Sequence, residues 1–272
     1  MEATWLKRLK PVLRTKKAYN RNMKLLSEAE LESSCIVANN RMNRERVALG
    51  SNGYETDLQF DPIEYLIEKY ESQQRVGWLD LCCGRGKALI ETGQHFLRLG
   101  ISANVNFVGV DLVGMFDPLP DELDFIALIE ASLSQWRTPQ TFDLITCVHG
   151  IHYVGDKLGL VSRALSMLNP NSLFSANLDE NNLRLLAPDH HKGEFEFNFA
   201  ERLRVEYVSD SFEFDPTYNL LRLTSDSQAN VQSLLTMLAQ FEFAGADDQA
   251  GPNYTGQEAV NSYYRVKNGV DN

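Results

Sequence analysis

The sequence predicts an α/β fold built on an open, doubly wound and mostly parallel sheet. Three observations support this prediction. Short apolar runs alternate with helical patterns from residue 76 onward, a loop with two glycines follows the first run, and an acidic residue ends the second. The chain has 272 residues, of which 43% are hydrophobic and 23% charged, so one full domain with an appended segment is expected.

Residues 1–75 read as mostly helical, and we expect them to form a lid that recognises the substrate. A capping box at Ser27 begins a helix that should extend to about Leu49, and Asp61-Pro62 opens a second helix to about Ser72. An equally weighted alternative is a plain helix surface that covers the sheet. The candidates for substrate recognition are Arg41, Asn43, Arg44 and Tyr54.

The first 24 residues carry a net charge of +7, whereas the remaining residues sum to −18. This segment suits a membrane surface or an acidic partner, but a solvated helix packed on the body or on a partner subunit is the preferred interpretation. The whole chain has a net charge of −11, which argues against nucleic acid as a partner. No membrane span and no signal-peptide pattern are found, so a cytoplasmic location is expected.

From residue 76 the pattern predicts parallel strands connected by helices. The expected strands are Trp78–Leu81, Asn106–Val110, Phe125–Ile129, Leu144–Cys147 and Leu173–Asn177. Helical patterns lie between them at Lys87–Leu99 and Asp156–Leu168, and Asn169-Pro170 stops the second helix.

Beyond Asp179 the alternation of apolar residues indicates an inserted β-ribbon at about residues 180–224. A helix follows Asp226. Phe241–Ala246 and Ser262–Val266 are expected to close the sheet as an antiparallel pair. We therefore divide the chain into the N-terminal segment 1–75 and a core domain, residues 76–272.

The sequence Leu79-Asp80-Leu81-Cys82-Cys83-Gly84-Arg85-Gly86-Lys87 lies where the first strand turns into the first helix, at the edge where open α/β sheets bind ligands. The third position of the dinucleotide fingerprint is Leu89, which disfavours a nicotinamide dinucleotide. Asp80 suits a ligand with an ammonium group. Asp111 ends the second strand, 25 residues after Gly86, where a carboxylate can accept both ribose hydroxyls. Together these features predict a nucleoside site.

At these positions the chain resembles the class I S-adenosylmethionine-dependent methyltransferases. Motif I is Asp80–Gly86, motif II is Val108–Leu112, the fourth strand is Phe142–Cys147, and the turn before the fifth is Leu168–Ser172. The resemblance covers about residues 76–178. It implies S-adenosylmethionine as cofactor and a Rossmann-like, mostly parallel seven-stranded sheet with an N-terminal helical lid and a small insertion after strand five.

The resemblance also implies which residues bind the cofactor. They are Asp80, Cys82 and Gly84 around the methionine moiety, Gly86 in the same loop, Asp111 at the ribose, Leu112 and Ser132 beside the adenine, and Cys147 near the sulfonium. The chain departs from the family after strand three, where an acidic residue often lies beside the adenine. Ala131-Ser132-Leu133 stands there instead, so contact through backbone groups and the Ser132 hydroxyl is expected.

Methyl transfer from a sulfonium mainly requires in-line alignment of the nucleophile and exclusion of water. A general base matters only for a weakly acidic hydroxyl or amine. His149 and His152 follow the fourth strand and are the catalytic candidates. For His152 packing is the preferred interpretation, whereas for His149 both roles stay open.

Metal chemistry is not expected. Asp189-His190-His191 with Glu194 has suitable ligand types, but adjacent histidines rarely both reach one ion, so a polar loop is preferred. Cys35, Cys82, Cys83 and Cys147 lack C-x-x-C spacing and are expected to be reduced thiols.

We expect an S-adenosylmethionine-dependent methyltransferase that acts on a small-molecule methyl acceptor at oxygen or nitrogen. One alternative is a macromolecule methyltransferase whose basic first 24 residues dock tRNA or an acidic protein. Another is a non-catalytic scaffold that kept the cofactor pocket. The oligomeric state stays open, although pairing of lid helices would give a homodimer.

Overall fold

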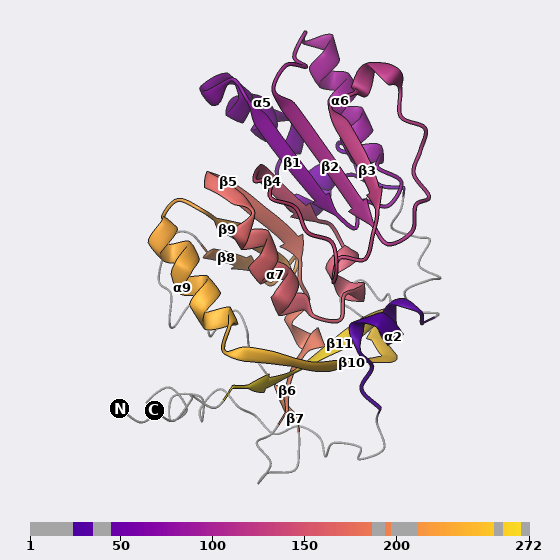
Figure 1. The fold of residues 1–272 in the computed structure, drawn as a ribbon, viewed down its shortest axis with the longest axis vertical. Helices are drawn as coiled ribbons and strands as arrows, with labels where there is room; N and C mark the ends of the chain where they lie inside the picture. The colour runs from indigo at the N-terminus through magenta and orange to yellow at the C-terminus, as the bar shows by residue number, and fades with distance from the viewer. Residues whose placement is uncertain (1–23, 35–44, 187–193, 197–211, 253–257, 268–272) are drawn as a thin grey trace.

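The computed structural model describes residues 24–34, 45–186, 194–196, 212–252 and 258–267. Its central sheet has the order β3-β2-β1-β4-β5-β9-β8 (Figure 1). Strands β1 to β5 run parallel, and β9 is antiparallel to both of its neighbours. The prediction of a mostly parallel, seven-stranded α/β sheet is therefore confirmed. The strands are β1 (Val76–Leu81), β2 (Val105–Asp111), β3 (Ile126–Glu130), β4 (Phe142–Cys147), β5 (Leu168–Asn177), β8 (Phe212–Asp215) and β9 (Leu220–Thr224).

Helices pack on both faces of this sheet (Figure 1). Side chains of α5 (Pro62–Gln73) and α6 (Lys87–Arg98) share one apolar cluster with Trp78, and those of α7 (Lys157–Ser166) and α9 (Gln228–Leu238) share another with Leu79 and Leu81. Successive residues of a strand point to opposite faces, so both faces of β1 are buried. This two-sided burial explains why β1 is a continuous apolar run apart from Asp80.

The caps confirm where two of the expected helices begin. Helix α7 ends at Ser166, earlier than expected, and Leu168–Ser172, expected as a turn, form the first part of β5. The Asp61 carboxylate caps α5 by accepting from the N–H groups of Ile63 and Glu64. The Asp156 carboxylate caps α7 by accepting from Gly159 N–H. The short 3₁₀ helices of the core are η1 (Asp121–Leu123), η2 (Gly150–Tyr153) and η3 (Glu180–Asn182).

A second sheet has the order β10-β11-β6-β7 and lies beside the first (Figure 1). Its strands are β6 (Leu183–Leu186), β7 (Glu194–Glu196), β10 (Phe241–Pro252) and β11 (Glu258–Val266). The prediction that Phe241–Ala246 and Ser262–Val266 close the main sheet was wrong: they pair antiparallel, but in the second sheet.

The place beside β5 is taken by β9, and β8 follows it, although both strands were expected to belong to an inserted ribbon. Leu221 and Leu223 of β9 are buried in the α7–α9 cluster. Local alternation indicates a strand but does not identify which sheet edge the strand joins, because that choice depends on burial of apolar surface across the whole domain.

The helix that begins at Ser27 is also shorter than expected. It covers only α2 (Glu28–Glu32), and the described chain from residue 45 forms turns before the short helix α4 (Tyr54–Leu58). The capping box at Ser27 is confirmed. Leu26 pairs with Ala246 of β10, so α2 is held against the second sheet by backbone hydrogen bonds rather than by a long helix (Figure 1).

A buried lysine joins the second sheet to the core. The Lys157 ammonium donates to the carbonyls of Val154 (2.9 Å) and Val260 (2.8 Å) and to Ser262 Oγ (2.9 Å). Tyr264 of β11 accepts from the first turn of α7 at Leu158 N–H. Burial lowers the pKa of Lys157 to about 7. No helix among these described segments is long and apolar enough to cross a bilayer.

The buried Lys157 predicts a pH dependence of stability. An unfolded lysine has a pKa of about 10.4, so between about pH 7 and 10 the unfolded chain binds a proton that the folded chain does not, and stability rises with pH in this interval. We expect the Tm of the protein to rise between pH 7 and 9.5 relative to that of Lys157→Met, measured by differential scanning calorimetry. Parallel Tm curves for the two proteins would contradict the prediction.

Candidate active site

The loop after β1 has left-handed backbone at three positions: Cys82 (φ 59°), Gly84 (φ 59°) and Gly86 (φ 78°). Cys82 is the only one with a side chain, and such a conformation is uncommon outside glycine and is typical of functional loops. Cys83 N–H donates to the carbonyl of Val110, which joins the loop to β2. The loop therefore presents a fixed backbone surface at the carboxyl edge of the sheet.

Asp111 at the end of β2 is held beside this loop. Its Oδ2 accepts from Gly84 N–H at 3.0 Å, and its Oδ1 accepts from Val113 N–H at 3.0 Å. Two N–H groups therefore fix the orientation of this carboxylate at the end of β2. This placement is compatible with the expected contact to ribose hydroxyls.

The loop after β4 packs tightly against Cys82. A Cβ on Gly150 would lie 2.1 Å from Cys82 Cβ and 2.7 Å from Cys82 Sγ, so only glycine fits there. The neighbouring thiol of Cys147, followed by burial, raises the pKa of Cys82 well above its usual value. Cys82 is therefore a neutral thiol at physiological pH. Cys82, Cys83 and Cys147 are all free cysteines, as expected.

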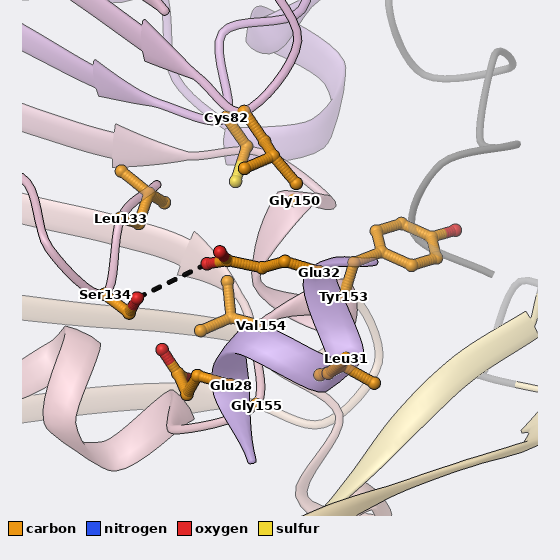
Figure 2. Close-up of a pocket in the computed structure, with 11 residues that line it drawn as sticks. Glu28, Leu31, Glu32, Cys82, Leu133, Ser134, Gly150, Tyr153, Val154 and Gly155 are labelled. Carbon is orange, nitrogen blue, oxygen red and sulfur yellow. Dashed lines mark hydrogen bonds between the residues drawn. The ribbon is translucent and has the colours of Figure 1, made fainter. Parts of the chain in front are cut away.

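A pocket opens between these loops and α2 (Figure 2). One wall comes from the loops after β1 to β4 and the other from α2. The lining residues are Cys82, Leu112, Leu133, Ser134, Gly150, Tyr153, Val154 and Gly155 on the first wall and Glu28, Leu31 and Glu32 on the second.

Asp80 is fully buried behind the loop and does not line the pocket. Its Oδ2 accepts from Tyr54 OH at 2.7 Å, and its Oδ1 accepts from Thr146 Oγ1 at 2.6 Å. Burial raises the pKa of Asp80 to about 7, against the opposing effect of these two hydrogen bonds. Tyr54, expected as a lid residue, is instead buried edge-on against Trp78.

His149 lies at the end of β4 with left-handed backbone (φ 55°). Its N–H donates to Asn177 Oδ1, and its Nε2 lies 3.1 Å from Asp57 Oδ1. Asp57 of α4 is also ion-paired with Arg46. The imidazole is thus oriented by a carboxylate that sequence reasoning missed, because nothing local indicates that α4 meets the end of β4.

His152 is completely buried, 5.9 Å from His149 between ring centroids. Burial lowers the pKa of His152 well below its usual value, so its ring is neutral. Neither histidine lines the pocket described above. The catalytic roles expected for them stay predictions.

The structure brings several of the expected cofactor residues together. Cys82 and Leu112 line the pocket, Gly84, Asp111 and Cys147 lie directly behind its wall, and Gly86 lies at the start of α6 against Leu128. Ser132 reaches it through a hydrogen bond to Glu32. Sequence reasoning missed the wall formed by α2, which lies 100 residues away from Ser132 in the chain.

Some expected positions lie outside the described residues: residues 1–23, Cys35, Arg41, Asn43, Arg44 and the Asp189-His190-His191 sequence. Where the structure places the chain, no group of three or more His, Cys, Asp or Glu side chains is arranged to hold a metal ion.

Residues 53–193, just over half of the 272-residue chain, match a protein family described as a methyltransferase domain. The matched region begins immediately before α4 and includes the whole carboxyl edge of β1 to β5. No curated protein matches the sequence significantly.

Several solved structures resemble the chain weakly. An amino pentose methyltransferase of calicheamicin biosynthesis from Micromonospora echinaspora, bound to S-adenosylmethionine, is 16% identical with a TM-score of 0.32; the match covers 42% of this chain and 48% of that one. A sugar N-methyltransferase from Streptoalloteichus is 20% identical with a TM-score of 0.32, and the match covers 42% of this chain and 46% of that one. The N-methyltransferase NodS from Bradyrhizobium japonicum, bound to S-adenosylhomocysteine, is 13% identical with a TM-score of 0.34. This match covers 61% of this chain and 86% of that one. The match spans about half the length of the first two, and at these TM-scores none carries an argument about substrate.

The buried carboxyl of Asp80 predicts a second pH dependence, opposite in sign to that of Lys157. An unfolded aspartate has a pKa of about 3.9, so between about pH 4 and 7 the folded chain binds a proton that the unfolded chain does not, and stability falls as pH rises. We expect the urea midpoint to fall between pH 5 and 7.5 relative to that of Asp80→Asn. The exposed control Asp121→Asn should keep the slope of the unmodified protein. An unchanged slope in Asp80→Asn would overturn the assignment.

Proposed function

The chain belongs to the methyltransferase-domain family, and from that premise we propose that it transfers a methyl group to the oxygen or nitrogen of a small molecule. It is an S-adenosylmethionine-dependent methyltransferase with a Rossmann-like fold. The observation that supports a small acceptor is the cover that α2 places over the pocket. The net charge of −11 agrees with this, since it disfavours a polyanionic acceptor.

The residues around the pocket fit S-adenosylmethionine. Asp111 would accept from the ribose hydroxyls, because its carboxylate is held at the end of β2 by backbone N–H groups of the adjacent loops. Leu112 and Leu133 would lie on either side of the adenine. The neutral Cys82 and the backbone of Gly84 would contact the methionine moiety without adding charge beside it.

When bound, the cofactor supplies a methyl group on a sulfonium, which is already an activated leaving group. The work left to this chain is orientation and exclusion of water. Leu31, which is 1% exposed, and Gly150, which packs on Cys82, would close the pocket against solvent from two sides.

His149 is our candidate for the general base that takes a proton from a hydroxyl or ammonium acceptor. Asp57 orients its ring through Nε2 and would stabilise the imidazolium that forms. His152 is assigned a packing role beside it, because a ring whose pKa lies well below its usual value is a poor base. The segment 1–75 would act as the lid through α2 and the position of α4.

Replacement of Asp111 tests the cofactor assignment. We expect Asp111→Ala to weaken binding of S-adenosylhomocysteine by on the order of a hundredfold, since both ribose hydroxyls lose a charged acceptor. Isothermal titration calorimetry measures this, with the exposed Asp124→Ala as a matched control. The unmodified protein should bind S-adenosylmethionine and not NADH. Equal affinity in Asp111→Ala and the control would remove Asp111 from the site.

Replacement of His149 tests the base. We expect His149→Asn to lower turnover on a hydroxyl or amine acceptor by on the order of a hundredfold or more, while affinity for S-adenosylhomocysteine is retained. His95→Asn is the control, because His95 lies in the last turn of α6, away from the loop after β4. A variant that keeps the turnover of the unmodified protein would show that His149 is structural.

A further inference from the structure

The side chain of Glu32 extends from α2 into the pocket, toward the loop after β3 (Figure 2). Its Oε1 accepts from Ser132 Oγ at 2.6 Å and from Ser134 Oγ at 3.4 Å. Ser134 N–H also donates to Ser132 Oγ, so the loop and the carboxylate form one hydrogen-bonded unit. Two serine hydroxyls therefore fix one carboxylate oxygen at the pocket wall, and the second oxygen belongs to the same fixed group.

We propose that Glu32 recognises the exocyclic amino group of the cofactor's adenine, and that it makes this enzyme selective for 6-amino over 6-oxo purine nucleosides. The inference rests on the proposed function, because it takes the pocket as the site of the adenosyl group. A carboxylate accepts hydrogen bonds and does not donate them, which suits an amino group and repels a carbonyl oxygen.

The position of Glu32 along the pocket favours the adenine over the reacting end of the cofactor. Leu112 directly follows Asp111, the expected ribose ligand, and Leu133 follows β3. These two apolar side chains suit the faces of a purine, and Glu32 reaches from the opposite wall to Ser134 beside them. The β1 loop at Cys82 and Gly84, assigned to the methionine moiety, lies on the other side of Asp111 along the sheet edge.

The other carboxylates near this wall, Glu130 and Glu28, either lie outside the pocket or are hydrogen-bonded to another element. Glu130 at the end of β3 packs beside Gly114, where an added Cβ would lie 2.1 Å from Glu130 Oε2, and it does not line the pocket. Glu28 does line the pocket, but its Oε1 accepts from Asp156 N–H at the start of α7. The loop of residues 131–134 has no acidic residue. Glu32 is therefore the carboxylate that meets this loop.

The backbone around Glu32 is rigidly supported. Ser27 and Glu30 close the capping box of α2, Leu26 pairs with Ala246 of β10, and Leu31 is buried beside Ala246 and Val260. A side chain that is already held by packing and by hydrogen bonds to other protein groups loses little conformational entropy when it binds a ligand. This support gives Glu32 the fixed geometry that discrimination between two hydrogen-bonding patterns requires.

The test compares S-adenosylhomocysteine with S-inosylhomocysteine, which carries a 6-oxo group in place of the 6-amino group, by isothermal titration calorimetry. We expect the unmodified protein to prefer the adenosyl compound by about tenfold to a hundredfold. In Glu32→Gln the preference should disappear, because an amide both accepts and donates. Glu30→Ala, which breaks the capping box without touching the pocket, should weaken both compounds equally and keep the preference.

The other outcomes overturn the inference in separate ways. Equal affinity of the unmodified protein for both compounds would refute the role of Glu32 while leaving the proposed function in place, whereas no affinity for S-adenosylhomocysteine would refute the proposed function itself. Equal weakening of both compounds in Glu32→Gln would show that Glu32 only supports α2. If Glu32→Gln keeps the preference but has a higher KM for an amine acceptor, Glu32 contacts the methyl acceptor and not the adenine. If Glu32→Gln fails to fold, Glu32→Asp and the unmodified protein decide between these outcomes.

Discussion

The rest of the site depends on the hydrogen bonds that the buried carboxyl of Asp80 accepts from Tyr54 and Thr146. This carboxyl joins three elements: β1, which carries it, α4 through Tyr54, and β4 through Thr146. Because α4 is held there, Asp57 meets His149 at the end of β4. A group with a raised pKa of about 7 persists in the interior because both partners are hydroxyl donors and because the sheet packs closely around it.

A second constraint comes from the sheet that lies outside the main one. The β11 strand is attached to α7 through Lys157 and Tyr264, and β10 holds α2 through Leu26. Elements late in the chain thereby place the earliest described helix over the ends of β1 to β4. The wall of the pocket that contains Glu32 thus depends on contacts between the two ends of the described chain.

Strands β1 to β5 and the loop after β1 were predictable because their signals are local. Two-sided burial makes β1, β2, β4 and the second half of β5 apolar runs, Asp61 and Asp156 are side-chain caps, and Gly84 and Gly86 mark a backbone turn. It was not predictable that β9 and β8 complete the main sheet while β10 and β11 form the second one. An alternating strand presents the same pattern to any sheet edge, so its partner is chosen by the total burial of the domain.

The sequence by itself determined the α/β class, the motif at the end of β1 and the carboxylate at the end of β2, since each follows from periodicity or from a residue type at a strand end. Only the tertiary structure decided that Tyr54 is buried on Asp80, that Asp57 orients His149 and that Glu32 meets Ser132. These contacts join residues separated by 26, 92 and 100 positions. No local pattern encodes such pairs, because they form only after the chain has packed its helices against the sheet.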